Sequence, residues 1–261
     1  MLALNAGRLP LVNPAAFRFA GGAVWMTTSR HATKLALARR DPHASFLVEG
    51  EGRTVVLRGL LETFDPRSLG GQVRALLEGP AFAWNLTGYA LKNAAYIGGY
   101  LLELASVPAE WWPHNRVLLR LRVEHARQLR RDETMLRPPG ARARLSGVPA
   151  EVARSLEGAA GYLCWQTSRG PTLAPVEWAP EGLDAMLRLT PGVGRGPCLG
   201  SSCALVLERH HPYRATRMVG TCVRGRLAEE ADGVRLVTER VTWWRGFRVR
   251  TLTVRRRAVV G

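Results

Sequence analysis

Residues 24–65 constrain the fold of this chain more than any other segment. They begin as an apolar strand and continue into a short basic helix that holds Lys34 and stops at Asp41-Pro42, before two further apolar strands. Proline disfavours helix in the residue before it, which explains the stop. The first strand ends in three hydroxyl residues, Thr27, Thr28 and Ser29. Such a strand end, with a lysine about one and a half helical turns further on, suits a phosphate group, because a helix N-terminus adds free N–H groups and a positive dipole end.

Lysine is rare in this chain, which makes Lys34 conspicuous. The chain has 37 lysines and arginines, of which only Lys34 and Lys92 are lysines. Such a bias indicates a genome that favours arginine codons, so a retained lysine suggests selection for its compact and flexible point charge. The alternative is that Lys34 is an ordinary exposed helix residue.

The net charge of +16 invites a nucleic-acid interpretation, since a basic surface attracts phosphate whatever its sequence. The arginines are nevertheless scattered along the chain, and no segment resembles a recognition helix or a zinc finger. We therefore expect weak, salt-sensitive adhesion to nucleic acid and no specific nucleic-acid partner.

The four cysteines form no C-x-x-C pair and have no histidines at zinc spacing, so the sequence predicts neither a disulfide framework nor a metal site. The first 14 residues lack the pattern of a secretory signal. The most apolar stretch, residues 94–107, is too short to span a bilayer. These features predict a cytoplasmic protein without a membrane partner.

Most of the chain outside residues 66–115 has strand character. Short apolar runs separated by glycine turns, such as the one at residues 50–52, predict a meander of strands and a barrel. Residues 116–124 alternate between apolar and mostly charged side chains, which is typical of a half-buried strand. Helical patterns occur at residues 69–78 and 89–105.

These patterns predict a mainly β (α+β) fold: two β-barrel modules in tandem with a helical insertion in the first. We expect residues 1–135 to form the first module, with the insertion at about residues 66–115. Residues 136–149 contain many prolines, glycines and arginines and are the expected linker. Residues 150–261 are the expected second, degenerate module.

An internal repeat supports two modules. A shift of 161 places four residues on related ones: Pro14 on Pro175, Phe17 on Trp178, Gly21 on Gly182 and Trp25 on Met186. A smaller shift lays residues 45–49 on residues 204–208, and a larger one lays Arg58-Gly59 on Arg224-Gly225. Changing shifts are expected between diverged copies that gained and lost loop residues.

The order of several motifs resembles the pyridoxamine 5'-phosphate oxidase-like FMN-binding split-barrel superfamily. The motifs are residues 9–14 (LPLVNP), residues 24–29 (VWMTTS) with Lys34, residues 40–42 (RDP), and strands that end at Arg58-Gly59. Members of that family are usually homodimers of six-stranded barrels that hold the cofactor between two subunits. The resemblance implies two split β-barrel modules in tandem, with the helical insertion in the first. It also implies that this chain is a fused form, an intrachain pseudo-dimer that can remain a monomer, with FMN in the groove between its halves.

Carried over by position, Thr28, Ser29 and Lys34 match the family residues that contact the FMN phosphate and ribityl chain. Thr27 is expected to help through its hydroxyl or backbone. Asn13 is placed to meet the ring or ribityl edge, although capping the turn at Pro14 explains it equally well. Because Trp25 and Thr28 are three residues apart on a strand, they face opposite sides, so Trp25 is expected in the core if Thr28 touches the ligand.

In the second half, Thr190 and Arg195 keep a hydroxyl and a cation that could imitate the phosphate motif, but Pro191 and Gly192 replace the start of the helix that would orient them. We therefore expect one cofactor per chain, with the second half supplying the opposing wall. Arg217 and Trp244 are the candidates for that wall. The pair His210-His211 raises the alternative of a haem ligand, and deazaflavin is a further alternative to FMN.

The resemblance implies an FMN-dependent oxidoreductase that acts on an unknown small molecule, with catalytic residues unknown. In such enzymes the cofactor transfers the hydride while the protein positions it. The alternatives are a non-catalytic protein that binds flavin, deazaflavin or haem, and a cofactor-free basic scaffold with weak affinity for nucleic acid.

Overall fold

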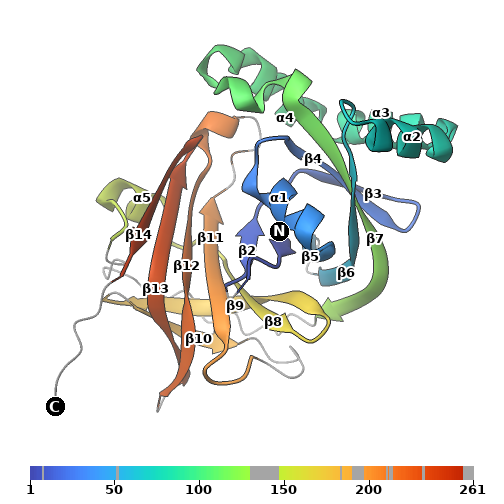
Figure 1. Ribbon diagram of the computed structural model, residues 1–261. Helices are drawn as coiled ribbons and strands as arrows, with labels where there is room; N and C mark the ends of the chain where they lie inside the picture. The colour runs from blue at the N-terminus through green and yellow to red at the C-terminus, as the bar shows by residue number, and fades with distance from the viewer. Residues whose placement is uncertain are drawn as a thin grey trace.

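Two seven-stranded antiparallel sheets lie side by side in the computed structural model of the chain, with a group of helices at one end (Figure 1). The structure describes residues 1–7, 9–50, 53–129, 147–182, 184–189, 197–209, 211, 214–230 and 233–254. Residues 136–146 of the expected linker lie outside these ranges, as do the segment 190–195, His210 and both residues at the tip of the 50–52 turn. The division into domains therefore stays a prediction.

The first sheet has the strand order β2-β1-β5-β6-β7-β4-β3. Its strands are β1 (Leu2–Leu4), β2 (Leu11–Asn13), β3 (Phe17–Ala20), β4 (Ala23–Ser29), β5 (His43–Gly50), β6 (Arg53–Phe64) and β7 (Arg116–Leu129). The basic helix α1 (Thr33–Arg40) connects β4 to β5, as residues 24–65 predicted. The alternation seen at residues 116–124 continues as strand to Leu129, and β1 was not expected at all.

The second sheet closes into a six-stranded barrel. Its order is β10-β9-β8-β11-β12-β13-β14, and β10 also pairs with β13, which brings the two ends together. The strands are β8 (Gly161–Thr167), β9 (Gly170–Glu181), β10 (Asp184–Leu189), β11 (Ser202–Arg209), β12 (Val219–Glu230), β13 (Gly233–Arg245) and β14 (Arg248–Thr253). The helix α5 (Ala150–Ser155) precedes them. The predicted fold class, mainly β with two split-barrel modules in tandem and a helical insertion in the first, is confirmed.

The strand registers of the two modules correspond at the positions that the repeat pairs. Phe17 pairs with Met26 in the first module, and Trp178 pairs with Leu187 in the second, each offset by 161. Both modules also carry a β-bulge at an Arg-Gly step, at Gly59 and at Gly225. Besides the insertion, the modules differ where β2 and β3 are separate short strands, whereas β9 runs on without a break. Descent of the two modules from one duplicated unit stays a prediction.

The helical insertion differs in one respect from the expectation. It contains α2 (Leu69–Glu78), α3 (Pro80–Lys92) and α4 (Ala94–Leu102), followed by the short 3-10 turns η1 (Leu104–Ser106), η2 (Ala109–Trp111) and η3 (Pro113–Asn115). The single helix expected at residues 89–105 is therefore wrong. The helix begins at Pro80, and Asn93 interrupts it because its side-chain amide donates to Tyr89 O at 2.9 Å and to Phe17 O at 3.3 Å.

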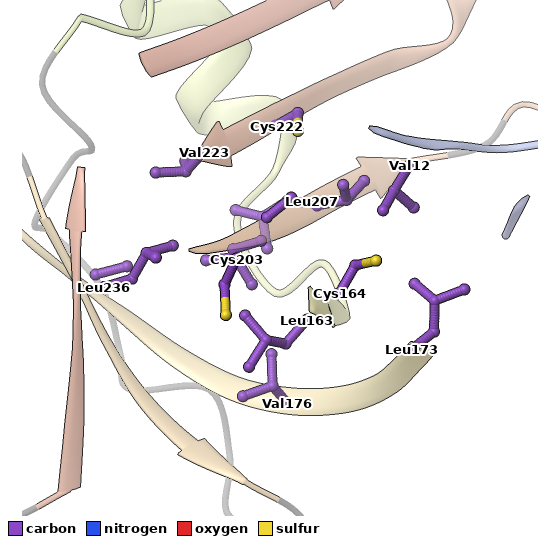
Figure 2. Packing of buried hydrophobic residues seen from close by; sticks show 14 of the residues in the cluster. Val12, Leu163, Cys164, Leu173, Val176, Cys203, Leu207, Cys222, Val223 and Leu236 are labelled. Carbon is purple, nitrogen blue, oxygen red and sulfur yellow. The ribbon is translucent and has the colours of Figure 1, made fainter. Parts of the chain in front are cut away.

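The largest hydrophobic cluster crosses the boundary between the modules. It contains most of the second barrel's core and also first-module residues, among them Val12, Leu47 and Val56. Figure 2 shows Val12 in one cluster with Leu207 and Leu173 of the second module. The interface is thus an apolar core shared by both modules, like that of an obligate dimer.

Three of the four cysteines belong to this shared core. Cys164, Cys203 and Cys222 are buried with reduced sulfurs, and burial raises the pKa of the Cys203 thiol to about 12 (Figure 2). Cys198 is exposed. Within the described ranges, no group of three or more His, Cys, Asp or Glu side chains is arranged to hold a metal ion, and none of the helices has the length and apolar character needed to cross a membrane.

Candidate functional site

The hydroxyls at the end of β4 split between the two faces of the strand. Val24 and Met26 lie in the first module's core, so alternation places Thr28 on the same face. Trp25 packs on the other face, against Phe64 and the insertion, as expected of a core residue. Thr28 is fully buried, and its Oγ1 has no hydrogen-bond partner in the described part of the chain.

Thr27 and Ser29 contact the helical insertion. The Thr27 hydroxyl lies 3.1 Å from the hydroxyl of Tyr89 on α3. The Ser29 hydroxyl donates to the carbonyl of Glu110 in η2 and accepts the backbone N–H of His31 at 3.1 Å. These two hydroxyls therefore attach the insertion to the end of β4, and the Ser29 donor is already used.

Lys34 lies in the first turn of α1 and is half-buried. The pKa of its ammonium is lowered to about 8, chiefly by burial and also by the charge of Arg116, while Glu208 opposes both. Within the described residues this ammonium forms no ion pair. A cation held without a bound anion is the arrangement expected of a phosphate subsite.

Glu208 at the end of β11 faces the first module. Burial raises the pKa of its carboxyl to about 7, against the opposing charges of the Met1 amine and Lys34. Its Oε1 is buried and has no hydrogen-bond partner among the described residues. Lys34 and Glu208 thus come from different modules and act on each other across their boundary, where β11 lies beside β2 (Figure 1).

A cleft of about 480 Å³ opens at this boundary. Its walls include Phe17 of the first sheet, Lys92 and Tyr96 of the insertion, and Glu208 and Met218 of the second module. Lys92 Nζ lies 3.7 Å from the centroid of the Phe17 ring, and burial lowers its pKa. Lys92 therefore lines the cleft. Lys34 does not line it, but its charge lowers the pKa of Glu208, which does.

The insertion places aromatic and cationic groups above this cleft. Arg116 begins β7 beside Ser29, and its guanidinium carbon lies 5.5 Å from the centroid of the Tyr100 ring. Burial raises the pKa of Tyr96, and Arg116 opposes that rise. Arg116 thus acts on both Lys34 and Tyr96, which places a second positive charge near the Lys34 subsite.

The remaining predicted site residues, Asn13, Arg217 and Trp244, are not among the residues that line the cleft. Asn13 is half-buried at the end of β2, next to Pro14, which lines the cleft. Arg217 is exposed in η4 (Ala215–Arg217), next to Met218. Trp244 shares a rung of the sheet with Gly220 and Glu208, so its side chain is on the Glu208 face, with its ring over Gly220.

The sequence interpretation missed four residues of this region: Arg116, Glu208, Lys92 as a lining residue, and Tyr96. One signal for Glu208 was available, because it ends a run of five apolar strand residues where a core position would be expected to continue. The others lie in or beside an insertion that the repeat does not contain. No pattern within either module could have located them.

Fold and cleft together define a tandem split-barrel protein with a largely apolar pocket between its modules, into which Lys92 and Glu208 bring charged groups. No protein-family model and no curated protein matches the chain. Solved structures do match it. A pyridoxamine 5'-phosphate oxidase-related, FMN binding protein from Nostoc punctiforme is 16% identical, with 67% of this chain and 84% of that chain covered and a TM-score of 0.36.

Two FAD-binding proteins are also similar to this chain at 16% identity and a TM-score of 0.30. For the protein from Mesorhizobium loti the match covers 48% of this chain and 80% of that chain. For the protein from Mycobacterium smegmatis it covers 37% and 93%. Pyridoxamine 5'-phosphate oxidase-like proteins, which the sequence motifs resemble, are thus among the similar structures.

Proposed function

We propose that this protein binds one FMN molecule per chain in the cleft between its modules and acts as an oxidoreductase on a small molecule. The observation that carries the proposal is a cleft of about 480 Å³ at the module boundary, lined by Glu208, whose charge and that of Lys34 act on each other across this boundary. Ligand pockets are commonly about 300–1,000 Å³ and lie at such boundaries. The sequence resemblance supports flavin as the ligand.

In this proposal Lys34 and Arg116 hold the phosphate end of the cofactor. The charge of Arg116 lowers the pKa of Lys34, so the two cations repel each other, and a bound dianion would offset this repulsion. Thr28, with its unpartnered Oγ1, adds a hydroxyl if the ribityl chain reaches the end of β4. Thr27 and Ser29 act through the backbone, since their hydroxyls bind the insertion.

The second module supplies the other wall. Glu208 offers a carboxyl whose Oε1 can donate to a ring or substrate atom when protonated and accept when ionised. Trp244 lies on the same face of the sheet as Glu208 and offers an apolar surface. The exposed Arg217 offers a positive charge to an anionic substrate. The bound flavin would supply the hydride transfer.

A visible spectrum of the freshly purified protein, with mass spectrometry of what heat releases, tests the cofactor. We expect a flavin spectrum and FMN. A colourless protein that does not bind added FMN would favour the cofactor-free scaffold instead. Oxidation of reduced nicotinamide by the coloured protein would separate an enzyme from a non-catalytic flavin binder.

Replacing Lys34 tests the phosphate subsite directly. A charge-assisted contact of this kind contributes about 1.5–3 kcal/mol, so Lys34→Ala should weaken FMN binding on the order of tenfold to a hundredfold. Riboflavin lacks the phosphate, and its affinity should be unchanged. Flavin fluorescence titration measures both.

Arg40→Ala is the matched control, because it removes one positive charge from the exposed end of the same helix. It should leave both affinities unchanged. Equal loss of FMN and riboflavin affinity in Lys34→Ala would remove Lys34 from phosphate binding.

As further parts of this proposal, we expect a monomer whose intrachain pseudo-dimer replaces the family's homodimer, and a cytoplasmic location. Size-exclusion chromatography with light scattering and cell fractionation test these two points.

A further inference from the structure

A second cleft lies on the module interface. It is separate from the flavin cleft, the cleft of about 480 Å³ in which we propose that flavin binds. It has a volume of about 210 Å³ and shares no lining residue with the first. Its walls come from β6 and β7 of the first module and from β8 and β9 of the second. Four basic side chains line it: Arg58, His125, Arg127 and Arg169.

The strand register explains why these side chains converge. Arg58 pairs with His125, and Val56 pairs with Arg127, so the side chains of Arg58, His125 and Arg127 project from one face of the β6–β7 ladder. Arg169 reaches the cleft from the turn between β8 and β9. The bulge that follows Arg58 ends this arrangement, because it shifts the register from Gly59 onward. The face carrying Arg58 meets β9 of the second module, where the Arg58 Nη2 donates to Thr172 Oγ1 at 2.5 Å.

Positive charge in this cleft is close-packed. Burial lowers the pKa of Arg58, and the charges of Arg127 and Arg169 lower it further, so the three guanidiniums repel one another. The lining contains no Asp or Glu among the residues that the structure describes. Positive charge gathered in a partly enclosed space attracts anions.

The floor of the cleft is apolar and rigid. Val56, Leu129 and Trp165 are each at most 6% exposed and line it together with Leu173. The neighbouring turn is anchored to the first module by Ser45, whose buried hydroxyl donates to Pro171 O at 2.5 Å. A ligand can therefore place an anionic group among the arginines and an apolar body against the floor.

We propose that this cleft binds the phosphate group of a small molecule at Arg58, Arg127 and Arg169, independently of the flavin. A guanidinium presents a planar fork of donors that matches phosphate oxygens, which is why arginine predominates where planar recognition of phosphate is needed. The volume admits a phosphate with a compact organic body, or free phosphate. Because the walls come from both modules, the bound anion bridges them.

Calorimetric titration at constant ionic strength tests this site, with inorganic phosphate and phenyl phosphate as the probes. Arg169 is exposed in the turn between β8 and β9, so Arg169→Gln should fold normally. We expect it to weaken phosphate binding at least fivefold. Arg154→Gln, which removes an exposed arginine from α5 of the same module, is the matched control and should change nothing.

The two probes distinguish the source of the phosphate. Phenyl phosphate bound at least fivefold more tightly than inorganic phosphate would show that the apolar floor is used and that the ligand is an organophosphate. Equal affinity would indicate free phosphate. Repeating the titrations in Lys34→Ala separates this site from the flavin subsite, since loss of the signal there would assign it to the flavin cleft and overturn the proposal.

Two further outcomes would also overturn it. One is an equal effect of Arg169→Gln and Arg154→Gln, which would indicate only a general charge effect. The other is an Arg169-dependent signal given by a short single-stranded DNA and not by either small phosphate, which would make this face a nucleic-acid contact.

Discussion

Two residues near the cleft proposed to bind flavin have strongly shifted pKa values. The pKa of Lys34 is lowered to about 8 and that of Glu208 is raised to about 7, in both cases chiefly by burial. Near neutral pH both groups are therefore close to changing their charge. A dianionic ligand would shift both equilibria, because it favours protonation of its neighbours. Cofactor binding should consequently take up protons at pH 8.

Glu208→Gln should remove a specific part of the pH dependence of stability. The folded pKa of Glu208, about 7, lies above its ordinary value of 4.5, so the folded state binds more protons than the unfolded state between these values. The free energy of unfolding therefore falls as pH rises through this window. Glu208→Gln should abolish that fall and gain on the order of 2 kcal/mol at pH 8 relative to the natural chain.

Urea unfolding at pH 5 and pH 8 measures this difference. Glu157→Gln, an exposed glutamate on the same module, is the control and should keep the natural pH dependence. If Glu208→Gln and the natural chain lose the same stability between the two pH values, Glu208 is not buried in its neutral form.

Sequence reasoning reached Lys34 and missed Glu208 for a physical reason. Lys34 stands out locally, by its strand end, its helix and the scarcity of lysine. The burial of Glu208 arises only when the first module covers β11. When contacts with a distant segment bury a residue, the neighbouring residues in the sequence do not show it.

At the scale of elements, the two glycine bulges stand out. A Cβ at Gly59 would lie 1.8 Å from the carbonyl oxygen of Arg122, and one at Gly225 would lie 1.9 Å from that of Val237. Both contacts are with backbone atoms, which cannot move aside as a flexible side chain can. The bulges therefore require glycine, and each changes the register at which its strand meets the next.

Gly59→Ala should destabilise the protein by about 2–4 kcal/mol, because β6 and β7 must separate to admit the methyl group. Gly70→Ala is the matched control: it lies in α2 with nothing within 4 Å of the added Cβ. Alanine favours helix, so this change should be neutral or stabilising. Denaturant midpoints of the two variants compare them, and a loss below about 0.5 kcal/mol for Gly59→Ala would show that the bulge relaxes freely.

Elements with strong local signals were predictable, and those set by tertiary contacts were not. Helix α1 and strands β5 to β7 follow from alternation and from Asp41-Pro42. The break at Asn93 depends on its bond to Phe17 O, and β1 is a strand because it pairs with both β2 and β5. Such partners are distant in sequence.

At the scale of the whole molecule, the insertion connects both modules. Its Glu103 carboxylate accepts the backbone N–H of Thr216 at 3.3 Å and lies 3.9 Å from Arg214, while Trp111 packs on Phe247 with ring centroids 5.7 Å apart. These contacts add to the shared core that contains Leu47 and Val56. In either module alone, the apolar residues of the shared core would therefore be exposed to water.

Thermal unfolding should therefore be a single cooperative transition. Leu47→Ala, a change in the first module that opens a cavity in the shared core, should cost about 2–5 kcal/mol and shift that one transition. Differential scanning calorimetry should give equal calorimetric and van't Hoff enthalpies. Two separate transitions, with only one moved by the substitution, would contradict the shared core.

The tandem arrangement was predictable, whereas the bridging role of the insertion was not. The correspondence of Phe17 with Trp178 and of Gly59 with Gly225 pointed to two modules. Residues 66–115 have no counterpart in the other half, so no repeated segment indicated where they would lie.

The shared core also has a consequence for synthesis. While the ribosome is still translating the second barrel, the emerged half presents Ala3, Val12, Leu47 and Val56 to water with nothing to cover them. Premature release at that stage should leave an aggregation-prone polypeptide, whereas two separately produced halves mixed in trans should reassemble into the complete protein.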